Sequence, residues 1–301
     1  MIYGPEGCGK TALLLCAEKV FEEEGYEVVM LRPLESPVAE RLRVSEGVKR
    51  VAGALLERLA GVDAAGLVEA VSELVAYSLR RLRGARLAVI LDDVFQAVGL
   101  ERVEGLAKSL LELLEYPPGE YERMVVLMAS SEGLSRWRLA RHNWVLTYAM
   151  WNLSRRGFQR LYEQLPERGL DAEEAWLVTG GNGRILRMLY ELDWSMECLV
   201  QFVTESRMLE RLVTSLNPED LEALRVFAAD PVRGEKLVLQ RPALLERLVG
   251  LNLVAEIPAE RSEWLWVDEP PSIDPRLGIG QRLAWQTPVY RTAIQKLVGG
   301  G

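Results

Sequence analysis

A glycine-rich octapeptide near the start of the chain has the residue types that bind a phosphate group. Residues 4–11 read Gly-Pro-Glu-Gly-Cys-Gly-Lys-Thr, a full match to the phosphate-loop pattern G-x-x-x-x-G-K-[ST]. Glycines let the backbone approach a phosphate closely, and the N-terminus of a following helix favours an anion. In this pattern Lys10 reaches the β- and γ-phosphates. The residues predicted to bind the phosphates are Gly4, Pro5, Glu6, Gly7, Cys8, Gly9, Lys10, Thr11 and Ala12.

Two aspartates follow the apolar run Leu87–Leu91, which is typical of a strand buried on both faces. A carboxylate at the end of such a strand holds Mg²⁺ beside the loop hydroxyl. We therefore predict that Thr11 and Asp92 bind the metal and that Asp93 orients or deprotonates an attacking water. The alternative is that both acids are exposed and cap the next turn.

Weaker signals follow later in the chain. Ser130 or Ser131 ends the apolar run Met124–Met128 and is placed to touch the γ-phosphate or its water, although a serine there is as often a helix cap. The segment Gly-Gly-Asn-Gly at 180–183 predicts a tight turn from which Arg184 reaches a phosphate. The alternative is a simple interhelical turn with a solvated Arg184.

Three arginines lie between the fourth and fifth expected strands. In ring-forming ATPases, an arginine at this position can reach the nucleotide bound by a neighbouring subunit. A solvated basic face is the favoured interpretation for them. They are Arg136, Arg138 and Arg141.

The hydrophobic pattern predicts two kinds of structure. In residues 1–150, short apolar runs alternate with helical patterns, which favours a parallel sheet with helices on its faces, an α/β fold. The strands expected there are 1–3, 27–31, 87–91, 124–128 and 144–148, and the helices are 9–24, 37–60, 64–83 and 100–115. Residues 151–203 predict a small helical bundle, with helices from Ser154, from Asp171 and after the turn at 180–183.

Residues 204–301 predict a winged helix. Helices start at Asn217-Pro218 and at Arg241-Pro242, where a capping residue or a proline precedes the first turn. Strands are expected at 253–257 and 263–267, forming a two-stranded ribbon, and a final helix at 288–297. The domain boundaries expected from these patterns are 1–150, 151–203 and 204–301.

Composition excludes several other classes of protein. The 301 residues carry a net charge of −8, so the whole chain is not a polycation that seeks nucleic-acid phosphates. Three cysteines are too few for a disulfide framework, and a single histidine, His142, excludes a His-rich metal site. No run of about 20 apolar residues and no signal peptide are present, so the cytoplasm is the expected location.

The segments GPEGCGKT, AVILDDVFQAVG, VVLMASSEG, GGNGR and TPVYRTAI together resemble the archaeal ATPase family, in the P-loop group of AAA-related and STAND-type NTPases. The resemblance covers nearly the whole chain. It implies a P-loop NTPase core with sheet order 5-1-4-3-2, a helical lid, a C-terminal winged helix, and ATP as the nucleotide.

Position by position, the resemblance implies roles for individual residues. Lys10 and Thr11 match the first nucleotide motif, Asp92 and Asp93 the second, Ser130 or Ser131 the sensor, and Arg184 the lid arginine. One position departs from the family, whose turn commonly reads Gly-Gly-Asn-Pro-Arg, because residue 183 here is glycine. The replacement predicts a more flexible turn.

The function expected from these features is binding of ATP or ADP with Mg²⁺ and slow hydrolysis, used as a switch in which ATP draws Arg184 toward the γ-phosphate. The residues expected to act in hydrolysis are Lys10, Asp93, Ser130 and Arg184. A protein partner is expected. The alternative is an ATP-regulated DNA-binding protein that places the helix at 242–249 in the major groove, with a local patch of Arg233, Lys236, Arg241 and Arg247. A scaffold that keeps nucleotide only for folding is the third interpretation.

Overall fold

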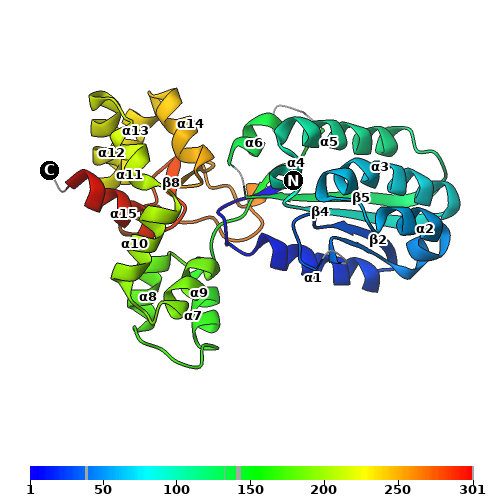
Figure 1. The fold of residues 1–301 in the computed structure, drawn as a ribbon, viewed down its shortest axis with the longest axis horizontal. Helices are drawn as coiled ribbons and strands as arrows, with labels where there is room; N and C mark the ends of the chain where they lie inside the picture. Colours follow the sequence, from blue (N-terminus) through cyan, green and yellow to red (C-terminus); the bar gives the residue numbers. More distant parts are fainter. Residues whose placement is uncertain (38–39, 132, 140–143, 300–301) are drawn as a thin grey trace. The chain divides into compact units, whose positions relative to one another are not determined.

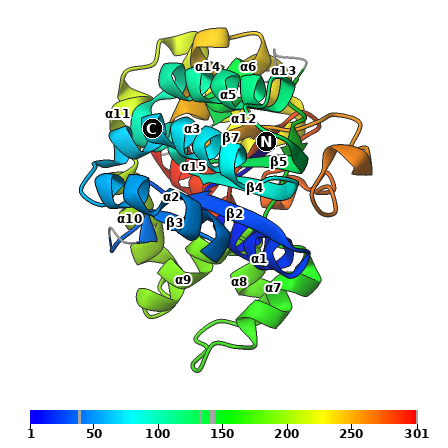
Figure 2. The ribbon, with the colours of Figure 1, turned by 90° about the vertical axis from the view of Figure 1, so that its right-hand side faces the viewer.

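The chain forms two compact units, shown in Figures 1 and 2. The computed structural model describes residues 1–37, 40–131, 133–139 and 144–299. The first unit consists of residues 1–3, 10–130 and 135–147, and the second of residues 4–9, 131–134 and 148 onward. The phosphate-loop motif is therefore shared, since its first six residues group with the second unit and Lys10 and Thr11 with the first.

The first unit is built on a mostly parallel sheet. Its strands are β1 (Ile2–Tyr3), β2 (Tyr26–Leu31), β3 (Leu42–Val44), β4 (Ala85–Asp92) and β5 (Tyr121–Ser130). They lie in the order β3-β2-β4-β5-β1, with every neighbouring pair parallel except β2 and β3. Asp92 pairs with Ala129 and Tyr3 with Ser130, so the carboxyl ends of β1, β4 and β5 meet at one edge of the sheet. The predicted α/β class with a parallel sheet is confirmed.

Helices cover both faces of this sheet. They are α1 (Lys10–Glu23), α2 (Glu46–Leu59), α3 (Ala64–Arg81), α4 (Val94–Val98) and α5 (Leu100–Glu115), with α6 (Gly133–Leu139) near the unit boundary. Figure 1 shows α1 on one face of the sheet and α3 and α5 on the other. Val89 and Leu91 of β4 join the core beneath α2, α3 and α5, and the alternate residues Ala88 and Ile90 are equally buried. A strand covered on both faces explains the unbroken apolar run.

Two predictions in this unit were wrong in part. Residues 42–44 form β3 rather than the start of a helix over 37–60, and α2 begins at Glu46. The edge of β2 has backbone groups that need partners; β3 pairs with them, and the Ser45 hydroxyl accepts from the N–H of Val28 at 3.0 Å. The strand expected at 144–148 is reduced to β6 (Tyr148–Ala149), while the Leu146 carbonyl accepts a hydrogen bond from the Met1 amine.

The second unit is mainly helical. Its helices are α7 (Arg155–Tyr162), α8 (Ala172–Thr179), α9 (Gly183–Glu191), α10 (Met196–Ser206), α11 (Leu209–Thr214), α12 (Pro218–Ala229), α13 (Pro231–Leu239), α14 (Pro242–Gly250) and α15 (Pro288–Gly299). The strands β7 (Val254–Glu256) and β8 (Leu283–Trp285) pair antiparallel, and the short 3₁₀ helices η2 (Glu263–Leu265) and η3 (Pro275–Leu277) lie between them in sequence. Among the described residues, no helix has the length and apolar character needed to cross a bilayer.

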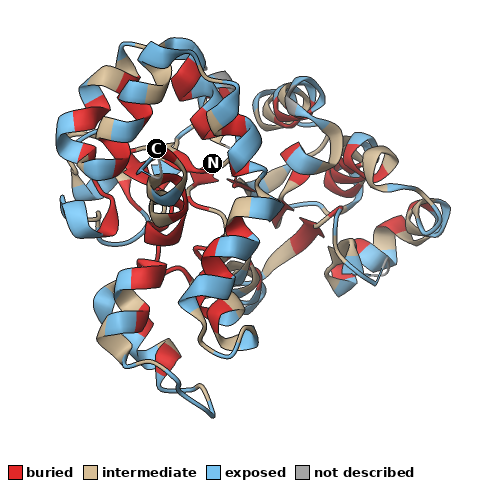
Figure 3. Cartoon of the chain, turned by 60° about the vertical axis from the view of Figure 1, so that its left-hand side comes forward, coloured by how far each residue is buried: buried red, intermediate tan, exposed pale blue. Residues whose placement is uncertain are grey.

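Residues predicted from the sequence to start helices cap several of them. Ser154 accepts from the Gly157 N–H ahead of α7, Asp171 and Glu174 form a capping box ahead of α8, and Asn217 accepts from the Asp220 N–H ahead of α12. The buried sides of α10, α12, α14 and α15 form one core, in which the rings of Phe227 and Trp285 stack at 5.2 Å. Figure 3 shows buried segments alternating with exposed ones along these helices.

The two-stranded ribbon has a different second strand from the one predicted. Residues 263–265 form η2, and β7 pairs with β8, in which Val254 is opposite Trp285. The guanidinium of Arg261 donates to the carbonyls of Pro271 and Gly280, which folds the residues between β7 and β8 back as an ordered loop. The alternation of Trp264 and Trp266 arises from this loop, where the first is exposed and the second buried.

Candidate functional site

The residues predicted to bind the metal come together at the carboxyl edge of the first unit's sheet. Lys10 and Thr11 begin α1, and Asp92 is the last residue of β4. The Thr11 side chain donates a hydrogen bond to the Asp92 carboxylate, and the Lys10 charge also acts on it. Lys10 and Asp92 are both only 4% exposed. A lysine, a hydroxyl and a carboxylate are thus grouped where the motif predicts them.

The Asp92 carboxylate has an electrostatic environment suited to a cation. Burial raises its pKa, as does the charge of Asp93, whereas the Thr11 hydrogen bond and the charges of Arg32 and Lys10 oppose that rise. Its Oδ1 atom is buried and has no hydrogen-bond partner among the described residues. The Arg32 Nε atom lies 3.9 Å from Oδ2. Because buried carboxylate oxygens need a partner, an unsatisfied oxygen beside a hydroxyl fits a hard cation such as Mg²⁺.

Asp93 has an unusual backbone conformation. Its φ of 49° and ψ of 27° are left-handed, and it precedes α4 without making a side-chain capping bond. The left-handed region is uncommon for residues other than glycine, although aspartate and asparagine tolerate it best. The interpretation that both acids are exposed caps does not fit, because Asp92 is buried and Asp93 makes no capping bond.

The serines at the end of β5 are buried. Ser130 is 1% exposed and is the last residue of the strand, paired in register with Tyr3 of β1. Ser131 is 8% exposed and groups with the second unit. Ser130 therefore lies on the same sheet edge as Asp92, as expected of a strand-end residue.

The first six residues of the motif form a tight loop within the second unit. Gly7 and Gly9 have φ values of 79° and 107°, which side chains other than that of glycine rarely adopt. A Cβ atom at Gly4 would lie 2.0 Å from the Met150 carbonyl oxygen, so this position also requires glycine. The Cys8 N–H donates to the Pro5 carbonyl at 3.3 Å, and the Cys8 side chain is buried. Ala12, by contrast, is exposed in the first turn of α1.

Buried amides hold the backbone of Glu6. The Glu6 N–H donates to Gln286 Oε1 at 3.0 Å, and the Glu6 carbonyl accepts from Asn182 Nδ2 at 2.8 Å. Asn182 Nδ2 also donates to Asn152 Oδ1, and its Oδ1 accepts from the N–H groups of Arg184 and Ile185. Asn182 is fully buried. One asparagine therefore caps α9 and fixes the loop.

Two arginines bind the carboxylate of Glu6. Arg184 Nη1 donates to Glu6 Oε1, and Arg207 Nη2 donates to Oε2. Arg207 also donates to the hydroxyl of Tyr290 at 3.2 Å. Arg184, predicted to reach a phosphate, thus lies at the loop, where it binds the loop's own acid. The Arg184 side chain is nevertheless 55% exposed, so it contacts both the loop and solvent.

The turn before Arg184 has the tight geometry expected of its glycines. Gly180 ends α8 with a φ of 60°, and Gly181 has a φ of 81°. Gly183 is the first residue of α9, where a Cβ atom would have Leu161 Cδ2 at 3.6 Å as its nearest neighbour. A side chain would fit there without strain.

The arginines considered for a neighbouring nucleotide are only partly described. The guanidinium of Arg136 lies 4.7 Å from the centre of the Tyr3 ring, a cation–π contact. The side chain of Arg138, and Arg141 and His142 as a whole, lie outside the described residues.

Sequence reasoning missed several residues of this arrangement. They are Arg32, Asn152, Asn182, Arg207, Gln286 and Tyr290. Asn182 has a local signal, since an asparagine directly before a helical pattern is a typical N-cap. The other five are far from the motif in sequence and follow no spacing rule, so only the fold brings them together.

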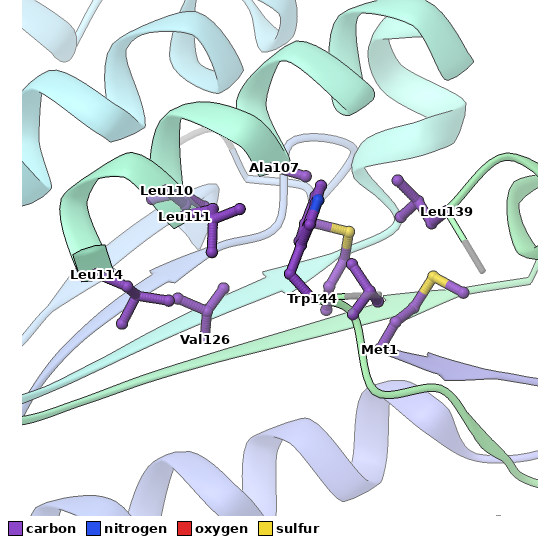
Figure 4. A pocket seen from close by; sticks show the side chains of 10 residues that line it. Met1, Ala107, Leu110, Leu111, Leu114, Val126, Leu139 and Trp144 are labelled. Carbon is purple, nitrogen blue, oxygen red and sulfur yellow. The ribbon is translucent and has the colours of Figure 1, made fainter. Parts of the chain in front are cut away.

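A separate cavity in the first unit is unsuited to a nucleotide. Its volume is about 130 Å³, and its walls come from α5, β5, Met1 and Trp144, as Figure 4 shows. All ten lining residues are apolar, and none is a predicted phosphate-binding residue.

Among the described residues, no cluster of three His, Cys, Asp or Glu side chains is arranged to hold a metal. A cation site at the carboxyl edge of the sheet would therefore rest on Thr11 and Asp92.

The solved structures similar to this chain include three archaeal proteins with TM-scores below 0.5. A Walker-type ATPase of Pyrococcus abyssi is 14% identical with a TM-score of 0.49, covering 98% of this chain and 90% of its own. The Aeropyrum pernix ORC2 protein (ADPNP–ADP complexes) is 18% identical with a TM-score of 0.41, at 100% and 87% coverage. Cdc6p from Pyrobaculum aerophilum is 13% identical with a TM-score of 0.38, at 99% and 87%.

A protein family matches more than half of the chain. No curated protein matches the sequence. The family described as "ATPase domain predominantly from Archaea" matches residues 1–189, which is more than half of the chain and includes the phosphate loop, Asp92, Ser130 and Arg184. The protein therefore belongs to this predominantly archaeal family of ATPase domains and is an ATP-binding ATPase.

Proposed function

We propose that the protein hydrolyses ATP slowly at a site made by the phosphate loop, Lys10, Thr11 and Asp92, and uses the nucleotide state as a switch. The observation that carries the proposal is the hydrogen bond from Thr11 to a buried Asp92 whose Oδ1 lacks a partner among the described residues. A site built only for folding has no reason to keep a buried carboxylate oxygen unsatisfied.

Each residue has a role in this proposal. Lys10 neutralises charge on the β- and γ-phosphates, and the backbone N–H groups at the start of α1 face an anion. Thr11 and Asp92 would hold Mg²⁺, which when bound neutralises the phosphate oxygens. Ser130, at the same sheet edge, donates its hydroxyl toward the γ-phosphate or the attacking water.

Asp93 is proposed as the residue that orients and deprotonates the attacking water. It adjoins Asp92, and its left-handed backbone is held without a capping bond. Strained backbone at the end of a strand is frequent at sites of chemistry. Aspartate is one methylene shorter than glutamate, which keeps the carboxylate farther from its target and supports slow turnover.

The switch is proposed to act through the second unit. Residues 151–203 serve as a helical lid and residues 204–301 as a winged-helix domain that contacts a protein partner. The support is that four residues of this unit contact the loop residue Glu6. They are Asn182, which caps α9, Arg184 in α9, Arg207 directly after α10, and Gln286 before α15. A conformational change of the loop would therefore alter contacts made by α9 and by the residues next to α10 and α15.

The alternative function, ATP-regulated DNA binding, has less support. Of the four residues in the local basic patch, three are already bonded within the protein. Arg233 pairs with Asp230, Arg241 with Asp220, and Arg247 donates to Ser215. A DNA phosphate would have to displace these partners. A mobility shift with duplex DNA at low salt tests this function, and the absence of a shift eliminates it.

The main proposal is tested by binding and turnover. Titration calorimetry with a non-hydrolysable ATP analogue should show tighter binding with Mg²⁺ than with EDTA. Purified protein should release phosphate from ATP only with Mg²⁺. Binding without any Mg²⁺ effect and without turnover would leave the scaffold interpretation and refute the switch.

A further inference from the structure

The carboxylate of Glu6 lies between two guanidinium groups that come from distant parts of the chain. Arg184 binds Oε1 and Arg207 binds Oε2. Glu6 occupies a position of the phosphate loop at which the motif specifies no residue type. A carboxylate with one cation on each oxygen resembles a phosphate group clamped by two arginines. This arrangement is therefore an anion-binding site that the protein fills with its own side chain.

The two arginines are held very differently. The Arg184 side chain is 55% exposed, whereas that of Arg207 is 27% exposed and that of Glu6 is 19% exposed. Arg207 donates to the Tyr290 hydroxyl and lies 5.5 Å from the centre of the Tyr290 ring. Burial raises the pKa of Tyr290, so its neutral hydroxyl remains an acceptor for Arg207. Arg207 is thus the fixed partner of Glu6, and Arg184 is the exchangeable one.

The backbone beneath this pair is fixed. Asn182 bonds both the Glu6 carbonyl and the first N–H groups of α9, and Gln286 accepts from the Glu6 N–H. A Cβ atom built on Gly7 would lie 2.4 Å from the Arg184 Cβ atom, so the base of the arginine adjoins the loop. Only the outer part of the Arg184 side chain is free to change its partner.

We propose that Glu6 is a specificity-determining residue of the nucleotide site, whose carboxylate competes with the γ-phosphate for Arg184. This inference rests on the proposed function, in which Arg184 moves to the γ-phosphate of ATP. With ADP bound, Arg184 stays on Glu6. With ATP bound, Arg184 exchanges the carboxylate for the more highly charged phosphate, and Arg207 alone retains Glu6.

The competition has a thermodynamic consequence. ATP binding must break the contact between Arg184 and Glu6, whereas ADP binding leaves it intact. Glu6 therefore weakens the binding of ATP without weakening that of ADP. Because Arg184 is more than half exposed, the contact is screened by water and its loss has a modest effect. Replacing Glu6 by glutamine should strengthen ATP binding about two- to fivefold.

The test is titration calorimetry on the full chain with Mg²⁺ and two probes, ADP and a non-hydrolysable ATP analogue. Glu6→Gln keeps the shape of the side chain and can still accept from Arg207. It should bind the analogue about two- to fivefold more tightly and bind ADP as the wild type does. The matched control is Glu191→Gln, which removes an exposed carboxylate that pairs with Arg187 on the same α9. It should change neither affinity.

Two results would overturn the inference. If Glu6→Gln strengthens binding of both nucleotides equally, the carboxylate acts only through its general charge. If it changes neither, Glu6 does not compete for Arg184. Both outcomes presuppose that the wild type binds nucleotide. A wild type that binds neither probe refutes the proposed function instead.

A second variant isolates the exchange from any effect on folding. In an Arg184→Ala background, the γ-phosphate has no arginine to gain, so adding Glu6→Gln should no longer favour the analogue over ADP. A selective gain that persists in this background would place the competition elsewhere and reject the role of Arg184. Thermal unfolding of each variant, measured without nucleotide, verifies that the compared proteins are folded.

Discussion

The side chain of Thr11, in the first turn of α1, donates a hydrogen bond to the carboxylate of Asp92 at the end of β4. The two residues come from the two motifs on which the proposed nucleotide site is based. Their contact forms within the first unit, and burial of Asp92 leaves its Oδ1 without a partner among the described residues. The pair is thus preformed, and substitutions at it should act on metal and nucleotide rather than on folding.

Replacing Asp92 by asparagine should remove the effect of Mg²⁺ on nucleotide binding. The amide has nearly the same size but no charge, so a hard cation loses its ligand. Calorimetry should show that Mg²⁺ no longer tightens binding of a non-hydrolysable ATP analogue. The exposed Asp268→Asn serves as the control and should behave as the wild type. Full retention of the Mg²⁺ effect in Asp92→Asn would show that the cation is held elsewhere.

Replacing Lys10 by alanine should weaken ATP binding by at least about tenfold, the range of a charge-assisted hydrogen bond. Lys10 is 4% exposed and begins α1 directly after the loop. Lys19→Ala on the same helix removes an exposed lysine and should leave the affinity unchanged. Equilibrium binding of a fluorescent ATP analogue measures both, and equal affinities in the two variants would contradict the assignment of Lys10.

Replacing Asp93 by asparagine should separate binding from turnover. Asparagine tolerates the left-handed φ of 49° at this position, so the backbone is kept while the proton acceptor is lost. We expect a fall in the rate of ATP hydrolysis of about 10²-fold or more, with unchanged affinity for ADP. Phosphate release and calorimetry provide the two measurements. Unaltered turnover would exclude Asp93 as the group that activates water.

Replacing Gly183 by proline should stabilise the protein. Position 183 is the first residue of α9, where proline is favoured, and Asn182 before it has an extended backbone that tolerates a following proline. The nearest neighbour of a new Cβ atom is 3.6 Å away. The loss of unfolded-state freedom predicts a gain of about 0.4–1 kcal/mol in the free energy of unfolding. Denaturant titration measures it, with Gly181→Pro as a contrast, because the φ of 81° there forbids proline.

The stability of the first unit should depend on the protonation of Glu18. Burial raises the pKa of this carboxyl above 4.5, while its ion pair with Arg43 opposes the rise. Folding therefore favours the protonated form, and the stability that this contributes is lost as the pH rises through the folded-state pKa. Glu18→Gln, which resembles the protonated form, should have a higher Tm than the wild type at pH 7.

The Tm difference between Glu18→Gln and the wild type should shrink as the pH falls below 4.5, where Glu18 is protonated in both folded and unfolded states. The exposed Glu23→Gln on the same α1 is the control and should follow the wild-type curve. A Glu18→Gln variant that is less stable than the wild type at pH 7 would show that the Arg43 ion pair outweighs burial.

Elements with local signals were predicted well. The apolar run at 87–91 predicted β4, because a strand covered on both faces must be apolar throughout. The polar residues Ser154, Asp171 and Asn217 predicted where α7, α8 and α12 begin. The meeting of Lys10, Thr11 and Asp92 at one edge of the sheet was expected for the same reason. Each of their signals is contained within a few residues of sequence.

Elements that depend on distant partners were not predicted. β3 exists because the edge of β2 needs hydrogen bonds, and residues 42–44 have no strong strand pattern of their own. The partner of β7 was misplaced because residues 263–267 alternate like a strand, whereas Arg261 folds them into a loop. Arg207 was missed for the same reason, since its contact with Glu6 joins residues 201 positions apart.

The Cβ atom of Arg184 restricts position 7 to glycine. A Cβ atom at position 7 would come within 2.4 Å of the Cβ atom of residue 184, and every amino acid except glycine has a Cβ atom. Relief of that overlap by substitution at 184 alone would require glycine there, which would remove the guanidinium group. Position 7 therefore cannot change alone, so we expect a genetic screen for suppressors of Gly7→Ala to recover substitutions that let α9 move rather than replacements of Arg184.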